Sequence, residues 1–191
     1  MATQLNTFVS PEEYLEIERK SETRSEYYDG VVYAMTGARI NHIRIVTNLA
    51  VELATQLRGR RCDVLTNEMK VRLQGSRKFF YPDVTVLCGE PQFHDERRDI
   101  ILNPLFVIEV LSESTEAFDR GAKFQAYQTL DSLKEYVLVA QDKPIVEQYV
   151  RQPDGKWTYT AVAGLESSLA QPSVECTLNL SAVYDKVDLD S

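Results

Sequence analysis

The sequence predicts a mixed α/β domain, with a central mixed β-sheet flanked by helices and an antiparallel extension near the C-terminus. Two segments carry apolar residues at helical spacing, and several short runs are rich in β-branched and aromatic residues. Two Asp-Gly pairs separate runs of this second kind. At 191 residues, 43% hydrophobic and 26% charged, the chain is long enough for one domain with a buried core.

The first two elements are predicted to be a short helix and a hairpin. Ser10 is a typical N-cap, Pro11 suits the first helical position, and acids follow in the first turn, so a helix is expected over about residues 11–19. Residues 25–36 then alternate around Asp29-Gly30, a dipeptide that favours a tight β-turn. These residues therefore predict a β-hairpin.

The main helix is predicted over residues 38–58, with Gly59 as its stop. Its apolar residues recur at helical spacing: Ile45, Val46, Leu49, Leu53 and Leu57. Four strands are expected next, at residues 62–66, 68–73, 81–88 and 104–112, with a loop at 89–103.

The last predicted elements are a helix and three strands. Ser114 or Thr115 is expected to cap a helix that runs to about Leu130. Strands follow at residues 135–140, 144–150 and 156–163, with Asp154-Gly155 as the turn between the last two. The expected single domain, residues 1–191, thus has a core over about 11–150, C-terminal strands over about 144–163, and a tail.

Charge and targeting signals restrict the partners. The formal net charge is −8, which opposes nucleic-acid binding. Residues 36–87 nevertheless hold nine Lys or Arg and four acids, so a local basic face is compatible with the sequence. No leader-like segment and no apolar run of membrane-spanning length occurs, so we expect a cytoplasmic protein with no membrane partner.

The cysteines and histidines limit the chemistry available. Cys62, Cys88 and Cys176 are odd in number and lack a C-x-x-C spacing, so they are expected to be reduced and structural. With only two histidines in the chain, a His-rich metal centre is not expected. A bound metal would therefore need oxygen ligands.

Two carboxylates interrupt strands that otherwise read as buried. Asp83 and Glu109 stand in the apolar runs YPDVTVLC and FVIEVLS, where an ionised acid without a partner is costly. If the two strands are neighbours, both acids converge on one point, and Mg²⁺ suits such an oxygen site. The pleat places Glu109 and Leu111 on one face and leaves the main-chain carbonyl of Val110 as a further ligand.

These residues carry a resemblance to a known family. Pro82-Asp83 followed by Glu109-Val110-Leu111 in a hydrophobic strand resembles the signature of the PD-(D/E)XK nuclease superfamily, whose fold is restriction-endonuclease-like. A longer ordered set, over about residues 11–149, is similar to the Uma-two family of bacterial endonucleases: Glu26-x-x-Asp29-Gly30, His42, Pro82-Asp83, Pro104 to Ser112, Asp119-x-x-x-Lys123, Tyr127 and Glu135-Tyr136-x-x-Val139. The resemblance implies a Mg²⁺-dependent endonuclease that hydrolyses DNA phosphodiester bonds, with Mn²⁺ as a substitute metal.

The resemblance also implies roles for individual residues. Asp83, Glu109 and the Val110 carbonyl would hold the metal, with Glu26 assisting directly or through water. Leu111 stands where the motif normally has a lysine, so a migrated lysine is implied.

Lys123 is the candidate for that lysine, and Lys70 is its substitute. The ordinary interpretations remain open here: Lys123 as a surface lysine paired with Asp119, Glu26 as a surface acid, and Glu109 as a structural ion-pair partner.

Two other functions are compatible with the same sequence. The absent motif lysine and the charge of −8 favour a nuclease-fold binding or assembly module that has lost hydrolysis. A hydrolase of small phosphate esters would need the same metal chemistry without a long basic groove. The resemblance also implies a homodimer, because cutting both strands of a duplex usually needs two sites.

Overall fold

The structure, a computed structural model, describes residues 8–35 and 37–189. Its helical segments are α1 (Pro11–Glu18), α2 (Ile40–Gln56), α3 (Glu116–Phe118), η1 (Asp119–Lys123), α4 (Phe124–Tyr127) and α5 (Leu180–Val183). Its strands are β1 (Ser25–Tyr28), β2 (Val31–Ala34), β3 (Cys62–Thr66), β4 (Lys70–Arg72), β5 (Lys78–Phe80), β6 (Val84–Cys88), β7 (Ile100–Ile101), β8 (Phe106–Leu111), β9 (Glu135–Ala140), β10 (Ile145–Arg151), β11 (Trp157–Ala163), β12 (Ser168–Gln171) and β13 (Cys176–Asn179). Thr36, which ends the predicted first hairpin, lies outside the described residues, as do residues 1–7 and 190–191 of the expected domain.

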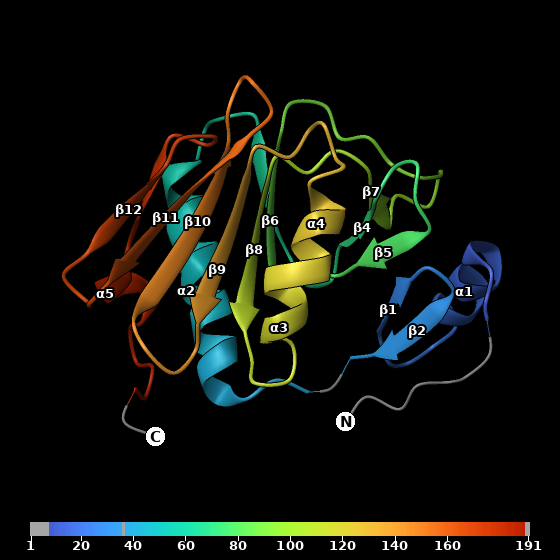
Figure 1. The fold of residues 1–191 in the computed structure, drawn as a ribbon, viewed down its shortest axis with the longest axis horizontal. Coiled ribbons are helices and arrows are strands. Elements are labelled where there is room, and N and C mark those ends of the chain that lie inside the picture. The colour runs from blue at the N-terminus through green and yellow to red at the C-terminus, as the bar shows by residue number, and fades with distance from the viewer. Residues whose placement is uncertain (1–7, 36, 190–191) are drawn as a thin grey trace.

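Two sheets organise the chain (Figure 1). The larger one has the strand order β11-β10-β9-β8-β6-β3, with β8 and β9 parallel and the other neighbours antiparallel. The smaller one has the order β2-β1-β5-β4-β7, and α3, η1 and α4 lie between the two sheets in Figure 1. The predicted mixed α/β class, with a mixed sheet flanked by helices, is confirmed.

Local interactions define the helix α1 and the β1–β2 hairpin. The Ser10 hydroxyl accepts the Glu13 N–H at 3.2 Å, and the Glu13 carboxylate accepts the Ser10 N–H at 2.9 Å. This reciprocal capping fixes the start of α1. Asp29 and Gly30 have φ values of 47° and 101°, the left-handed conformation that joins β1 to β2 in a tight hairpin. Both predicted elements are confirmed.

The central strand β8 is buried on both faces. One face carries Phe106, Ile108 and Val110, which pack with the buried residues of α2. The other face carries Val107 and Leu111, which pack with side chains of α4 and β9. The alternation along the strand therefore places Glu109 on the face covered by the η1–α4 segment. In the described part of the chain no helix is long and apolar enough to cross a membrane.

The predicted helix after Ser114 is not a regular α-helix. Its central residues, Asp119–Lys123, form a π-helical turn between the short helices α3 and α4. Single π-helical turns of this kind are frequently found at functional sites. Asp119 and Lys123 are both buried, and propensity alone predicts neither the wider turn nor the inward direction of two charged side chains.

The sequence did not predict the short strands β5 and β7 or the elements that follow residue 163. β5 and the two-residue β7, which lies within the predicted loop 89–103, are too short to show a period. After residue 163 the chain forms the β12–β13 hairpin and α5, whose apolar side chains join the core beneath α2. Glu135 in β9 anchors this segment by accepting hydrogen bonds from the Ser173 N–H and hydroxyl.

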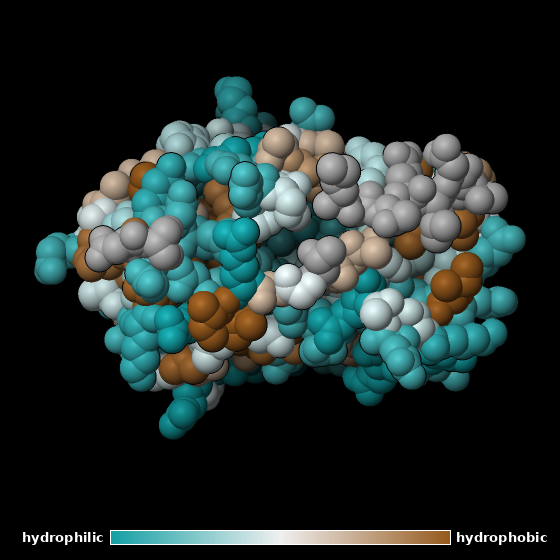
Figure 2. All heavy atoms as spheres, turned by 90° about the horizontal axis from the view of Figure 1, so that it is seen from below, coloured by the Kyte–Doolittle hydropathy of each residue, from teal (hydrophilic) through white to brown (hydrophobic). Residues whose placement is uncertain are grey.

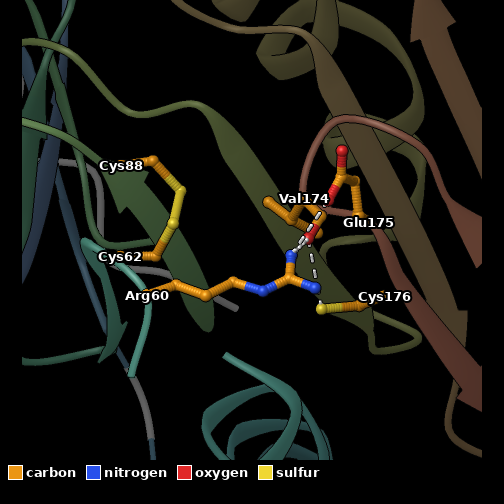
Figure 3. The surroundings of a disulfide bond; sticks show 6 residues. All are labelled: Arg60, Cys62, Cys88, Val174, Glu175 and Cys176. Atoms are coloured by element: carbon orange, nitrogen blue, oxygen red, sulfur yellow. Dashed lines mark hydrogen bonds and ion pairs between the residues drawn. A yellow bond between two sulfur atoms is a disulfide. The ribbon is translucent and has the colours of Figure 1, made fainter. Parts of the chain in front are cut away.

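A disulfide joins β3 to β6, which contradicts the prediction of three reduced cysteines. Cys62 and Cys88 are direct partners in that antiparallel pair and are bonded to each other (Figure 3). Spacing along the chain did not reveal them because strand pairing brings together residues separated by 26 positions. Cys176 is a buried free thiol, as expected. Figure 3 also shows Arg60 reaching from beside the disulfide to the Val174 carbonyl, which accepts its hydrogen bond at 2.9 Å.

Reduction of this disulfide is expected to lower the free energy of unfolding. Closing a loop of this length restricts the unfolded chain by about 3.5 kcal/mol. Urea unfolding with and without dithiothreitol measures the difference, and Cys176→Ser in both buffers is the control for the free thiol. Equal unfolding midpoints in the two buffers would show that the bridge does not stabilise the fold.

Candidate active site

The two strand acids lie opposite each other. Val84 of β6 pairs with Ile108 of β8 in antiparallel register, so the next position along sets Asp83 opposite Glu109. Both side chains are buried, with 8% and 3% of the residue exposed. The expectation that the strands are neighbours is confirmed, and the chain thereby brings two carboxylates together in its interior.

Asp83 is held by two hydrogen bonds. Its Oδ2 accepts the Val110 N–H at 2.7 Å, and its Oδ1 lies 3.0 Å from His42 Nε2 near the start of α2. The N–H and C=O of a strand residue point to the same side. Because the Val110 N–H points to Asp83, the Val110 carbonyl points to the same side of β8. The pairing of β6 with β8 ends at Ile108, so no residue of β6 pairs with Val110.

Lys123 lies at the centre of a second group of carboxylates. Its Nζ is 2.9 Å from Glu109 Oε1, 3.0 Å from Glu26 Oε1 and 3.4 Å from Asp119 Oδ1. With 4% of the residue exposed, Lys123 is not the surface lysine of the ordinary interpretation. Glu109 therefore belongs to both groups, beside Asp83 on one side and Lys123 on the other.

Glu26 reaches this group from the smaller sheet. Besides Lys123, its Oε1 accepts the Tyr81 N–H at 3.0 Å, two residues before Asp83. Its side chain is largely buried, so the alternative of a surface acid is wrong. Through these two contacts Glu26 orients Lys123 and the segment around Tyr81.

Lys70 lies in a different environment. It is buried, with Nζ 5.0 Å and 5.1 Å from the ring centroids of Tyr14 and Tyr81, a cation–π geometry. Burial lowers its pKa, against the charge of the neighbouring Glu18. The structure thus places Lys123, and not Lys70, among the carboxylates of Glu26, Glu109 and Asp119.

Negative charge is in excess in this interior. Burial opposes the charge of Lys123, but Glu109, Glu26 and Asp119 outweigh it and raise the pKa of Lys123 well above its usual value. Burial, Asp119 and Asp83 raise the pKa of Glu109 well above its usual value, although Lys123 opposes this. The ammonium therefore stays charged, and the surrounding carboxylates can accommodate further positive charge.

The residues fit a hard divalent cation. Lys123 is close to Glu109 Oε1 but outside hydrogen-bonding geometry, which leaves this buried oxygen without a hydrogen-bond donor. Within residues 8–35 and 37–189, no three His, Cys, Asp or Glu side chains form a metal cluster by themselves. A cation held by two carboxylates, one carbonyl and water needs no such cluster, and Mg²⁺ characteristically keeps several waters.

Three polar side chains near the site were not assigned a role from the sequence. His42 belongs to the ordered set of the resemblance, which gives it no stated role. Burial opposes its charge, but the hydrogen bond and charge of Asp83 raise its pKa. The buried hydroxyls of Tyr127 and Thr85 have no hydrogen-bond partner in the described chain. Tyr127 at least followed Lys123 at helical spacing, whereas nothing in the sequence marked Thr85.

The surface is hollowed on the side where β8 ends. Figure 1 shows that the C-terminal end of β8 and the N-terminal end of α2 both lie at the lower side of the molecule. Seen from that side, Figure 2 shows a central hollow with hydrophilic residues at its floor.

Comparisons with known proteins find a matching family model and similar relatives. Residues 11–182 match a family model described as "Uma2: Putative restriction endonuclease". Two uncharacterized proteins of Synechocystis sp. (strain ATCC 27184 / PCC 6803 / Kazusa) are similar. One, sll1609, is 35% identical over 80% of this chain and 86% of its own length, and the other, slr1290, is 36% identical over 78% and 77%.

A solved structure has the same fold. It is described as a putative nuclease belonging to DUF820 from Anabaena variabilis ATCC 29413, and it aligns with a TM-score of 0.77 over 94% of this chain and 99% of its own. The sequence identity is 16%, so the likeness concerns the fold alone. The expected restriction-endonuclease-like architecture is confirmed.

Proposed function

Because this chain belongs to the Uma2 family, we propose that it is a divalent-metal-dependent endonuclease that hydrolyses phosphodiester bonds in DNA. The observation that carries the proposal is the buried meeting of Asp83, Glu109 and Lys123. Mg²⁺ is the proposed ion, with Mn²⁺ as its substitute, and we place the enzyme in the cytoplasm as a homodimer. Its family description supports a nuclease; the DNA substrate, the ion, the location and the dimer are our proposals.

The proposed metal ligands are Asp83, Glu109 and the Val110 carbonyl. When bound there, a divalent cation supplies Lewis-acid polarisation of a phosphoryl oxygen. Asp83 is kept in place by His42 and the Val110 N–H, so its carboxylate needs little reorganisation to serve as a ligand. His42 is then a positioning residue, since it acts through Asp83.

Lys123 takes the part of the missing motif lysine at Leu111. Its ammonium is fixed by Glu26, Asp119 and Glu109, and its raised pKa keeps the proton on Nζ. From that position it orients an attacking water and stabilises the charge that develops on the phosphate. Glu26 assists by holding Lys123 and the Tyr81 N–H.

A panel of substrates tests this function. Supercoiled plasmid, single-stranded DNA and a chromogenic phosphodiester are incubated with the protein at several Mg²⁺ concentrations and at low and high salt. Cleavage of DNA well above that of the small ester supports an endonuclease. The charge of −8 favours weak non-specific binding. Cleavage of the ester alone would identify a small phosphate-ester hydrolase, and DNA binding without cleavage a binding module.

Metal binding is expected to strengthen as the pH rises. Burial and the neighbouring acids raise the pKa of Glu109, so at low pH a bound proton competes with the metal for this carboxylate. We therefore expect Mg²⁺ to raise the Tm strongly in alkaline buffer and weakly in acidic buffer. Thermal melts with Mg²⁺ or EDTA over a pH series measure this. A Mg²⁺ effect independent of pH would contradict Glu109 as a ligand.

A further inference from the structure

Asp83 lies on the connection between the two sheets. β5 of the smaller sheet ends at Phe80 and β6 of the larger sheet begins at Val84, so residues 81–83 alone connect these two strands. The connecting residues belong to neither strand, and the Pro82 nitrogen has no hydrogen to donate. The backbone that carries the proposed metal ligand is therefore not fixed by a strand ladder, and other contacts must hold it.

Tyr81, the first residue of this connection, is held at three points. Its N–H donates to Glu26 Oε1 of β1 at 3.0 Å, and its hydroxyl donates to Glu18 Oε1 of α1 at 2.9 Å. Its ring centroid lies 5.1 Å from Lys70 Nζ of β4. The elements α1, β1 and β4 lie together on the right in Figure 1. Backbone, hydroxyl and ring of Tyr81 are thus all fixed from the side of the smaller sheet.

The groups that hold Tyr81 are themselves placed by contacts. Glu18 accepts the Ser25 N–H at 3.1 Å and also accepts the Ser25 hydroxyl. Lys70 Nζ lies 5.0 Å from the ring centroid of Tyr14, whose hydroxyl donates to the Ser25 carbonyl. Glu18 and Lys70 are both buried. Charged groups are costly to bury and apolar side chains would fill the same space, so this cluster indicates a requirement for a fixed Tyr81.

The larger sheet holds the other end of the connection. Val84 continues into the ladder between β6 and β8. The Asp83 carboxylate accepts the Val110 N–H at 2.7 Å and lies 3.0 Å from His42 Nε2. Since two residues separate the ring of Tyr81 from this carboxylate along the chain, a shift of Tyr81 moves Asp83 relative to the larger sheet.

We propose that Tyr81 is a positioning residue for Asp83. The smaller sheet and α1 hold Tyr81, and Tyr81 sets where the Asp83 carboxylate meets the larger sheet. The inference rests on the proposed function, in which Asp83 is a metal ligand. Lys70 then acts through the Tyr81 ring and takes no part in the reaction itself. Because its ligand is already in place, a metal ion binds without first ordering the connection.

Amide NMR spectra in EDTA test the positioning without any metal. The Val110 N–H donates to the Asp83 carboxylate, so its resonance reports where that carboxylate lies. Tyr81→Phe removes the hydroxyl bond to Glu18 and keeps the ring, and Lys70→Met removes the cation and keeps the hydroxyl. We expect the Val110 resonance to shift in both variants.

Tyr27→Phe is the matched control from the same sheet. Tyr27 is fully buried in β1, and its hydroxyl donates to the Val9 carbonyl at 2.8 Å, outside the cluster around Tyr81. This variant loses one buried hydroxyl bond, as Tyr81→Phe does, so its Tm should also fall. Its Val110 resonance should stay at the wild-type position.

Metal titrations extend the test to the proposed function. In Tyr81→Phe and Lys70→Met, the Mg²⁺ concentration that half-saturates the rise in Tm should increase about tenfold, as expected when a residue that orients a metal ligand is lost. Tyr27→Phe should keep the wild-type value. Cleavage by the two test variants should fall at limiting Mg²⁺ and recover at saturating Mg²⁺, because bound metal then holds Asp83 in place.

The two readouts separate the positioning from the endonuclease. A Val110 resonance that stays in place in both test variants, or that shifts equally in Tyr27→Phe, would overturn the positioning role, whatever the protein does to DNA. A lower Tm with unchanged half-saturation by Mg²⁺ would likewise make Tyr81 a structural residue only. A wild type whose Tm does not respond to Mg²⁺ would instead contradict the proposed metal site.

Discussion

Lys123→Met is expected to lower the free energy of unfolding by about 3–5 kcal/mol at neutral pH, because it removes the cation from a buried ion-pair network. The ammonium lies within 3.4 Å of Glu26, Glu109 and Asp119, and methionine offers these carboxylates no compensating charge. The variant should also lose cleavage, since Lys123 is the group proposed to orient water.

The pH dependence of this loss follows from the same network. Burial raises the pKa values of both Glu26 and Glu109, so these acids take up protons as the pH falls and need Lys123 less. The destabilisation should therefore shrink toward acidic pH. Urea unfolding over a pH series measures it, and the exposed Lys156→Met should change stability by no more than about 0.5 kcal/mol. A loss for Lys123→Met as small as that of the control would contradict a buried network.

Glu109→Gln is expected to separate activity from stability. Cleavage should fall by at least about a hundredfold, because the amide is a poor ligand for a hard cation and carries no charge. The fold should be at least as stable as that of the wild type in metal-free buffer. Since the folded state raises the pKa of Glu109, its protonated form stabilises the fold at low pH, and this contribution is lost as the pH rises. The glutamine avoids that loss, so its relative stability should increase with pH.

A matched surface variant controls for the amide substitution. Glu113→Gln lies just after β8 on the exposed surface and should change neither cleavage nor Tm. Cleavage rates with excess Mg²⁺ and melts in EDTA are measured for both variants. A Glu109→Gln protein that cleaves at the wild-type rate would remove Glu109 from the site, and one that melts far below the wild type would make it a structural partner of Lys123.

The placement of Asp83 and Glu109 was accessible from sequence because strand geometry is regular. Acids in two apolar runs had to be accommodated in the interior, and a period of two fixed the face of Glu109 once its strand was known. Lys123 was reached through the resemblance. Helix propensity predicts neither the π-turn of η1 nor the inward direction of Lys123. Lys123 contacts Glu26 and Glu109, which lie far from it in the sequence, and propensity takes no account of such contacts.

The contacts that were missed depend on residues far apart in the chain. His42 meets Asp83 across 41 positions, and Cys62 meets Cys88 across 26. Each pair is made by the docking of separate elements, and neither leaves a local pattern. The C-terminal hairpin was missed for a related reason: it packs its alternate residues on α2, and four-residue strands are too short for that alternation to be distinctive.

The most direct test of the central claim is plasmid cleavage by the wild type and by Asp83→Asn, purified identically, over a range of Mg²⁺ and Mn²⁺ concentrations. The account predicts metal-dependent nicking by the wild type, none above background by Asp83→Asn, and similar melting of the two proteins in EDTA. Equal cleavage by both proteins would contradict a site built on Asp83. Absence of cleavage by the wild type at every metal concentration would contradict the endonuclease itself.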